Sequence, residues 1–140
     1  MKRSKTLLAA NILATLYSFY LLWTFGGAII EAGGTDFINA MEAYFKMAFE
    51  FLGTSSPEAT LLYVIVILLC IHIISFVIGC LIGWFAYLIK KSGGAKFAAT
   101  LYLLGTFCFP VCLLFGLPIT ISGYIGGSQQ KKINNKTTTA

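Results

Sequence analysis

The chain has 140 residues, of which 58% are hydrophobic and 11% are charged, and its formal net charge is +5. A soluble domain of this length could not bury so much apolar surface, so the composition predicts a single, all-α integral membrane domain. Most of the bases lie in three small, separated groups, which argues against a surface for nucleic acid.

The first apolar segment, residues 7–30, contains no charged residue. It is longer than the roughly 20 residues that cross a hydrocarbon core about 30 Å thick. The basic start MKRSK suggests a signal peptide, but the segment is too long for one and no good cleavage site follows. We therefore predict a retained transmembrane helix. Small residues spaced four apart predict a helix-packing stripe along it: Ala10, Ala14 and Ser18.

Residues 31–58 carry all five acids of the chain, whereas nine of the ten bases lie elsewhere. By the positive-inside rule, this segment is extracellular and the N-terminus is cytoplasmic. Residues 36–52 would have one polar and one apolar side as a helix, which predicts an amphipathic helix on the outer membrane surface. Such a helix would serve either as a lid over the helix ends or as a docking surface for a partner.

Residues 57–89 form the second predicted transmembrane helix, with no charged residue from position 59 onward. A second stripe of small residues runs along it: Ser75, Gly79 and Gly83. Because the two helices run antiparallel, Ala10 should reach the depth of Gly83, and Ser18 that of Ser75. This matching predicts that the two stripes pack on each other within one molecule, with a homodimer face as the alternative.

His72 is the only histidine, and it lies near the middle of the second segment and hence near the bilayer midplane. An ionisable group at this depth is a candidate functional site, although neutral histidine also joins helices through hydrogen bonds. Tyr17 and Ser18 lie at a similar depth and are its predicted partners. Because the uncharged runs 7–30 and 59–89 contain no acid for a proton relay, a structural role is favoured over an ion or proton role.

The last apolar segment, residues 97–127, follows a tight cytoplasmic turn predicted from the sequence SGG. It is long for one crossing and short of the roughly 40 residues that two full crossings need. A single kinked crossing, giving three transmembrane helices, would leave the basic tail outside, against the charge rule. We therefore predict a short helical hairpin, whose turn should be shielded from lipid by the first two helices.

Three residues mark the predicted turn of this hairpin: Pro110, Gly116 and Pro118. Each proline disfavours a helical conformation at the residue before it, and the glycine eases a reversal. The two short helices are expected at about residues 97–109 and 118–127. A polar tail, residues 128–140, then returns to the cytoplasmic side.

The stretches KKSGGAKFAATLYLL and LLFGLPITISGYIGGSQQKK resemble the C-terminal half of a family of small four-helix membrane proteins from Gram-positive bacteria. In that family, a basic loop precedes a short helical hairpin with a proline in its turn, and a basic tail follows. The family is a domain of unknown function. The resemblance therefore implies a fold and brings no catalytic residues.

Four cysteines raise the question of a metal or redox site. Cys70 and Cys80 would lie about 15 Å apart along a helix, beyond disulfide reach, and no CxxC motif occurs. The sequence also lacks the GxSxG, HExxH, P-loop and dinucleotide-binding motifs. We therefore predict free thiols, no cofactor, no metal site and no enzymatic activity.

The remaining features favour an accessory or binding subunit of a larger membrane complex, in transport, envelope maintenance or stress response. Its partners would be the lipid bilayer, a larger membrane protein and further copies of itself, within the cytoplasmic membrane. One alternative is an oligomeric transporter or pore for a small solute or ion, with His72 as a gate. Another is a bacteriocin-immunity protein or a phage holin.

Overall fold

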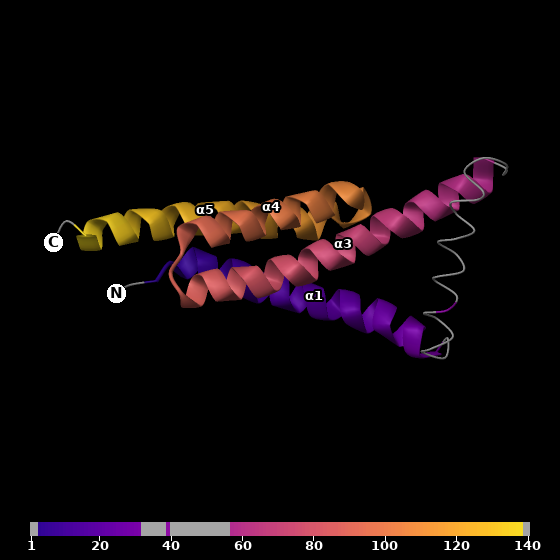
Figure 1. Cartoon of the computed structure of the whole chain (residues 1–140), viewed down its shortest axis with the longest axis horizontal. Helices are drawn as coiled ribbons and strands as arrows, with labels where there is room; N and C mark the ends of the chain where they lie inside the picture. Colours follow the sequence, from indigo (N-terminus) through magenta and orange to yellow (C-terminus); the bar gives the residue numbers. More distant parts are fainter. Residues whose placement is uncertain (1–2, 32–38, 40–56, 139–140) are drawn as a thin grey trace.

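The computed structural model describes residues 3–31, 39 and 57–138 (Figure 1). The all-α architecture is confirmed for this part of the chain. Its elements are α1 (Lys5–Glu31), α3 (Pro57–Leu88), α4 (Ser92–Cys108), the 3-10 turn η1 (Pro110–Cys112) and α5 (Leu113–Thr138). The predicted amphipathic helix at 36–52 lies outside the described residues, apart from residue 39.

The four α-helices pack side by side as a bundle at the end where both chain termini lie (Figure 1). α4 and α5 form an antiparallel hairpin, in which α4 packs mainly on α3 and α5 lies against both α4 and α1. Beyond the tip of this hairpin, α1 and α3 continue and diverge (Figure 1). Among the described helices, four therefore meet at one end, here called the closed end, and two reach the other, here called the open end.

Three of the described helices contain segments long and apolar enough to cross a membrane: Lys5–Phe25, Ile67–Leu88 and Pro110–Lys136. α4 has 17 residues, which corresponds to about 25 Å, slightly less than a hydrocarbon core. These lengths are consistent with a multi-pass membrane protein. The chain reverses after α4, so Lys131, Lys132 and Lys136 return toward the closed end, where α3 is joined to α4 (Figure 1).

The turn between α4 and α5 lies earlier and is tighter than the sequence predicted. The reversal occurs at Phe109 and η1, so Pro110 alone of the three predicted turn residues lies in it. Pro118 lies inside α5. Gly116 is in α5 as well, directly against Thr106, where a Cβ atom would clash. The glycine is thus needed for close helix packing and not for the reversal.

The turn contacts both of the first two helices, which were predicted to shield it: Phe109 lies against His72 of α3, and Phe115 against Tyr17 of α1. Two of its backbone amides also form hydrogen bonds within the hairpin. The amide of Phe109 donates to the carbonyl of Gly105 over 3.2 Å, and that of Cys112 to the carbonyl of Phe109 over 3.1 Å. Val111 of η1 and Leu114 of α5 point outward and are more than 80% exposed, whereas Cys112 packs against the core.

The connection between α3 and α4 is formed by residues 89–91 and not by the predicted SGG turn, which belongs to α4. Lys90 has a φ of 58°, in the left-handed region. The amide of Lys91 donates to the carbonyl of Ala86 over 2.9 Å, and the amide of Lys90 to that of Tyr87 over 3.4 Å. This pattern is a Schellman motif with lysine at the position that glycine usually takes.

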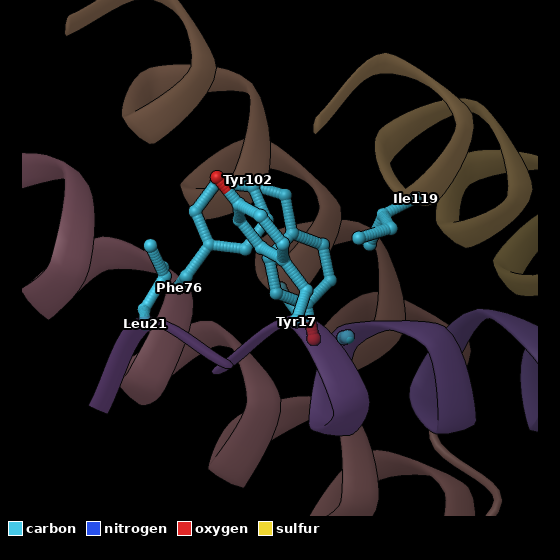
Figure 2. Close-up of a cluster of buried hydrophobic side chains, with 7 residues drawn as sticks. Tyr17, Leu21, Phe76, Tyr102 and Ile119 are labelled. Atoms are coloured by element: carbon cyan, nitrogen blue, oxygen red, sulfur yellow. The ribbon is translucent and has the colours of Figure 1, made fainter. Parts of the chain in front are cut away.

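The main core lies where the hairpin meets α1 and α3. Figure 2 shows the rings of Tyr17, Phe76 and Tyr102 gathered between the helices, with Leu21 and Ile119 beside them. Phe76 and Tyr102 stack with ring centroids 5.3 Å apart, and Tyr17 meets Phe76 edge-on at 4.8 Å. Such pairs stabilise a fold beyond their area of burial by about 1 kcal/mol each.

Candidate functional site

The central polar contact of the bundle joins α1 to α3. The hydroxyl of Tyr17 lies 2.9 Å from Nε2 of His72, and Nδ1 of His72 lies 2.8 Å from the backbone oxygen of Gly105 in α4. Because a carbonyl oxygen can only accept, Nδ1 carries the proton. In the neutral ring, Nε2 then accepts a hydrogen bond from the Tyr17 hydroxyl. One imidazole therefore links three helices.

Aromatic side chains surround this pair. The His72 ring, which is fully buried, lies 4.9 Å from the Phe76 ring and 5.8 Å from that of Phe109 in the hairpin turn. Phe115, in the first turn of α5, stacks on Tyr17 at 5.9 Å. Phe109 and Phe115 of the hairpin thus cover the Tyr17–His72 pair, and the His72 side chain has no exposed surface.

The structure brings together two of the three residues proposed for this polar site. Tyr17 bonds to His72, but the hydroxyl of Ser18 donates instead to the backbone oxygen of Phe76 over 3.4 Å. Both contacts connect α1 to α3. Ser18 therefore supports the same helix pair without reaching the imidazole.

The predicted packing residues are all buried, but their partners differ from those expected. Ala10 and Ala14 in α1 and Ser75, Gly79 and Gly83 in α3 line the interior. However, a Cβ atom at Gly79 would meet the ring of Tyr102 at 2.7 Å, and one at Gly83 would meet the Tyr102 hydroxyl at 3.1 Å. The glycine stripe thus admits an aromatic ring from α4 in addition to its contact with α1, where a Cβ atom at Gly83 would meet the Asn11 side chain at 2.7 Å.

Asn11 is the hydrogen-bonding partner of Gly83 on α1, where Ala10 was predicted to lie opposite this glycine. Its side-chain amide donates to the Gly83 backbone oxygen over 3.0 Å. Asn11 and Tyr102 were both missed. The available signal was Asn11 itself, because a lone amide inside an apolar segment usually bonds to a neighbouring helix.

A second polar group lies one turn from Asn11. The hydroxyl of Thr15 donates to the Asn11 backbone oxygen over 2.7 Å and accepts from the indole nitrogen of Trp84 over 2.8 Å. It also lies 3.3 Å from the sulfur of Cys80. These bonds join α1 to α3 and give Trp84 a specific partner on α1.

The segment predicted as a polar tail is the end of α5 and docks onto the rest of the bundle. Gln130 is buried, and its side-chain oxygen accepts from the amide of Ser4 over 3.0 Å. The side chain of Asn134 donates to the backbone oxygen of Lys90 over 2.9 Å. Arg3 lies over the ring of Tyr87 at 5.1 Å. The helix continues to Thr138 because its polar residues have partners far away in the sequence.

The chemistry available in this arrangement is hydrogen bonding within a buried, largely apolar interior. The four cysteines are free, and no three His, Cys, Asp or Glu residues converge as a metal site among the residues described. Cys112, in the hairpin turn, is half-buried beside the aromatic core. The site is therefore suited to fixing the helices in one arrangement.

No family model matches the chain, and comparisons with curated proteins and with solved structures find no match. The resemblance to the four-helix Gram-positive family therefore stays a prediction. Any functional inference depends on the arrangement of the chain's own residues.

Proposed function

We propose that this chain is a multi-pass protein of the cytoplasmic membrane that acts as an accessory or binding subunit of a larger membrane complex. The proposal is supported by the contrast between the two ends of the bundle. At the closed end, the hairpin fills the space beside α1 and α3. At the open end, these two helices diverge, and no third helix of the described residues lies between them (Figure 1).

The open end carries large apolar side chains that the described part of the chain leaves uncovered. Leu22 and Trp23 of α1, and Leu61, Val64 and Ile65 of α3, are all exposed. A partner helix that lies between two diverging helices can contact both of them. This increases the van der Waals packing that drives association in lipid. This exposed pair of helices is the observation that carries the proposal.

The proposed orientation puts the closed end on the cytoplasmic side. This end holds the N-terminal bases, the α3–α4 connection and the basic end of α5, while all five acids lie in or between the far ends of α1 and α3. The positive-inside rule favours this arrangement. The hairpin then enters from the cytoplasmic side and returns to it.

Site-specific photo-crosslinking in native membranes tests the proposed function. A photoreactive residue at Leu61, which is 65% exposed at the open end, should crosslink to one discrete membrane protein. The matched control is Leu81 on the same helix, 67% exposed at the closed end, where we expect crosslinks to lipid only. Lipid-only crosslinks at both positions would contradict the accessory role.

An oligomeric transporter or pore is the second candidate, because the irregular backbone of η1 lies next to His72 within an apolar bundle. The aromatic rings around His72 argue for a sealed site in one molecule, so a pathway would have to form between copies. Liposomes containing the purified protein should then transport or leak. Tight liposomes would exclude this candidate.

A further inference from the structure

The outward face of α5 changes from apolar to basic along a single line. Leu114, Ile121, Ile125, Ser128 and Lys132 lie within roughly 60° of one another on the helix. The opposite face of α5 is occupied by the bundle. There, a Cβ atom at Gly123 would meet Ala99 of α4, and one at Gly126 would meet Leu7 of α1. The line therefore faces away from the protein.

A shallow groove of about 360 Å³ lies where this line changes polarity. Its lining residues are Tyr124, Ile125, Ser128, Gln129 and Lys132. Hydrogen bonds to other parts of the bundle hold two of these side chains in place. The Tyr124 hydroxyl lies 2.8 Å from that of Thr100 in α4, and the side-chain oxygen of Gln129 accepts from the hydroxyl of Ser4 over 2.9 Å. Neighbouring helices thus fix two of its lining side chains.

The charge around this groove is of one sign. The start of α1, the α3–α4 connection, the start of α4 and the end of α5 meet at the closed end (Figure 1), and these segments carry eight bases: Arg3, Lys5, Lys90, Lys91, Lys96, Lys131, Lys132 and Lys136. The acids of the chain all lie between residues 31 and 58, in or between the opposite ends of α1 and α3. The groove therefore attracts anions, and its lining is apolar at Ile125.

We infer that this groove binds an anionic phospholipid, with the headgroup phosphate at Lys132 and Ser128 and an acyl chain along Ile125 and Ile121. The inference rests on the membrane location in the proposed function. The seven positions from Ile125 to Lys132 span about 10 Å, which matches the step from the acyl chains to the headgroups. A soluble phosphate would gain nothing from the apolar end of the groove, so the match is to a lipid.

Lysine and a hydroxyl suit this role. A Lys ammonium provides three hydrogen-bond donors and a full positive charge for a phosphate, and a serine hydroxyl adds one uncharged donor. Juxtamembrane bases attract anionic headgroups in general, so all the bases at this end contribute to the local lipid concentration. Lys132 lines the groove and would therefore bind a headgroup at a defined position, which distinguishes it from the other lysines.

Native mass spectrometry of the full chain, released from nanodiscs of equal phosphatidylglycerol and phosphatidylcholine, tests the site. We expect one phosphatidylglycerol to be retained in preference to phosphatidylcholine. Lys132→Gln should lower this retention by about three- to tenfold, and Ser128→Ala by about twofold. Lys91→Gln is the matched control, since Lys91 is exposed at the same end but outside the groove.

Equal losses in Lys132→Gln and Lys91→Gln would overturn the site and leave only a diffuse basic surface. Absence of any preference for phosphatidylglycerol in the unaltered chain would overturn it too. Displacement of the lipid by millimolar inorganic phosphate would identify a soluble anion as the ligand. Failure of the chain to enter nanodiscs would instead contradict the membrane location, and absence of a partner crosslink at Leu61 would contradict only the accessory role.

Discussion

The hydroxyl of Tyr17 and Nε2 of His72 lie 2.9 Å apart, although 55 positions separate the two residues in the chain. Replacing Tyr17 with phenylalanine removes the donor and leaves a fully buried imidazole nitrogen without its partner. We expect Tyr17→Phe to destabilise the protein by about 1–2 kcal/mol. Unfolding in a graded series of denaturing detergent measures the change, and an unaltered midpoint would show that the bond contributes nothing.

Tyr102→Phe also removes a tyrosine hydroxyl, but we expect that it does not lower the free energy of unfolding. Among the described residues, no hydrogen-bond partner reaches the buried Tyr102 hydroxyl. Its removal releases a desolvated polar group, so we expect stability to be unchanged or to rise by up to about 1 kcal/mol. The same detergent titration compares the two variants directly. A loss as large as that of Tyr17→Phe would mean that the hydroxyl has a partner, such as an internal water.

Gly79→Ala should separate α3 from α4. The added methyl group would lie 2.7 Å from the Tyr102 ring and 3.4 Å from the backbone oxygen of Ala98, so the helices or the ring must move. We expect a loss of about 1–3 kcal/mol. Gly27→Ala is the control, because no atom of the described residues lies within 4 Å of a Cβ atom there. It should be neutral or slightly stabilising, and equal losses would contradict close packing at Gly79.

Lys90→Gly should stabilise the connection between α3 and α4. Lys90 has a φ of 58°, which costs a residue with a Cβ atom about 1 kcal/mol. Glycine removes this strain but also loosens the unfolded chain, so the expected gain is about 0.5 kcal/mol. Lys90→Ala, which removes the charge and keeps the Cβ atom, is the control. A gain of the same size in both variants would assign the effect to charge.

The side of the membrane reached by the C-terminus tests the proposed topology. A cysteine at Ala140, in a background without native cysteines, should react with an impermeant thiol reagent only after the cells are permeabilised. Ser92→Cys, at the start of α4, should behave in the same way, and Thr54→Cys should react in intact cells. Labelling of position 140 in intact cells would reject a hairpin in the membrane and indicate three crossings.

The helices and the reversal could be predicted because they depend on local properties of the sequence. Uncharged runs mark α1 and α3, and the basic groups indicated that the end of α5 returns to the side of Lys90. The position of the turn could be predicted only in part. Proline and glycine are read as turn signals, but Pro118 is tolerated in α5 and Gly116 is there because Thr106 lies against it.

The side-chain partners could be predicted only where depth alone determines them. Tyr17 and His72 are matched in depth, and their contact followed from that. The ring of Tyr102 between the α3 glycines depends on how α4 rotates, which no spacing in the sequence specifies. The helical state of residues 128–138 was missed for a similar reason. Gln130 bonds to Ser4, 126 positions away, and a local pattern cannot show this.

The self-bonded turn at Phe109 and η1 has a consequence for how the protein is assembled in the cell. Residues 97–130 contain no charged side chain, and the amides of Phe109 and Cys112 are hydrogen-bonded within the hairpin while Val111 and Leu114 point outward. A hairpin of this kind can enter a bilayer from one face with no charged side chain carried across. The glycine-lined side of α3 is then available to receive it, so α1 and α3 can be inserted first and the hairpin can complete the bundle afterwards.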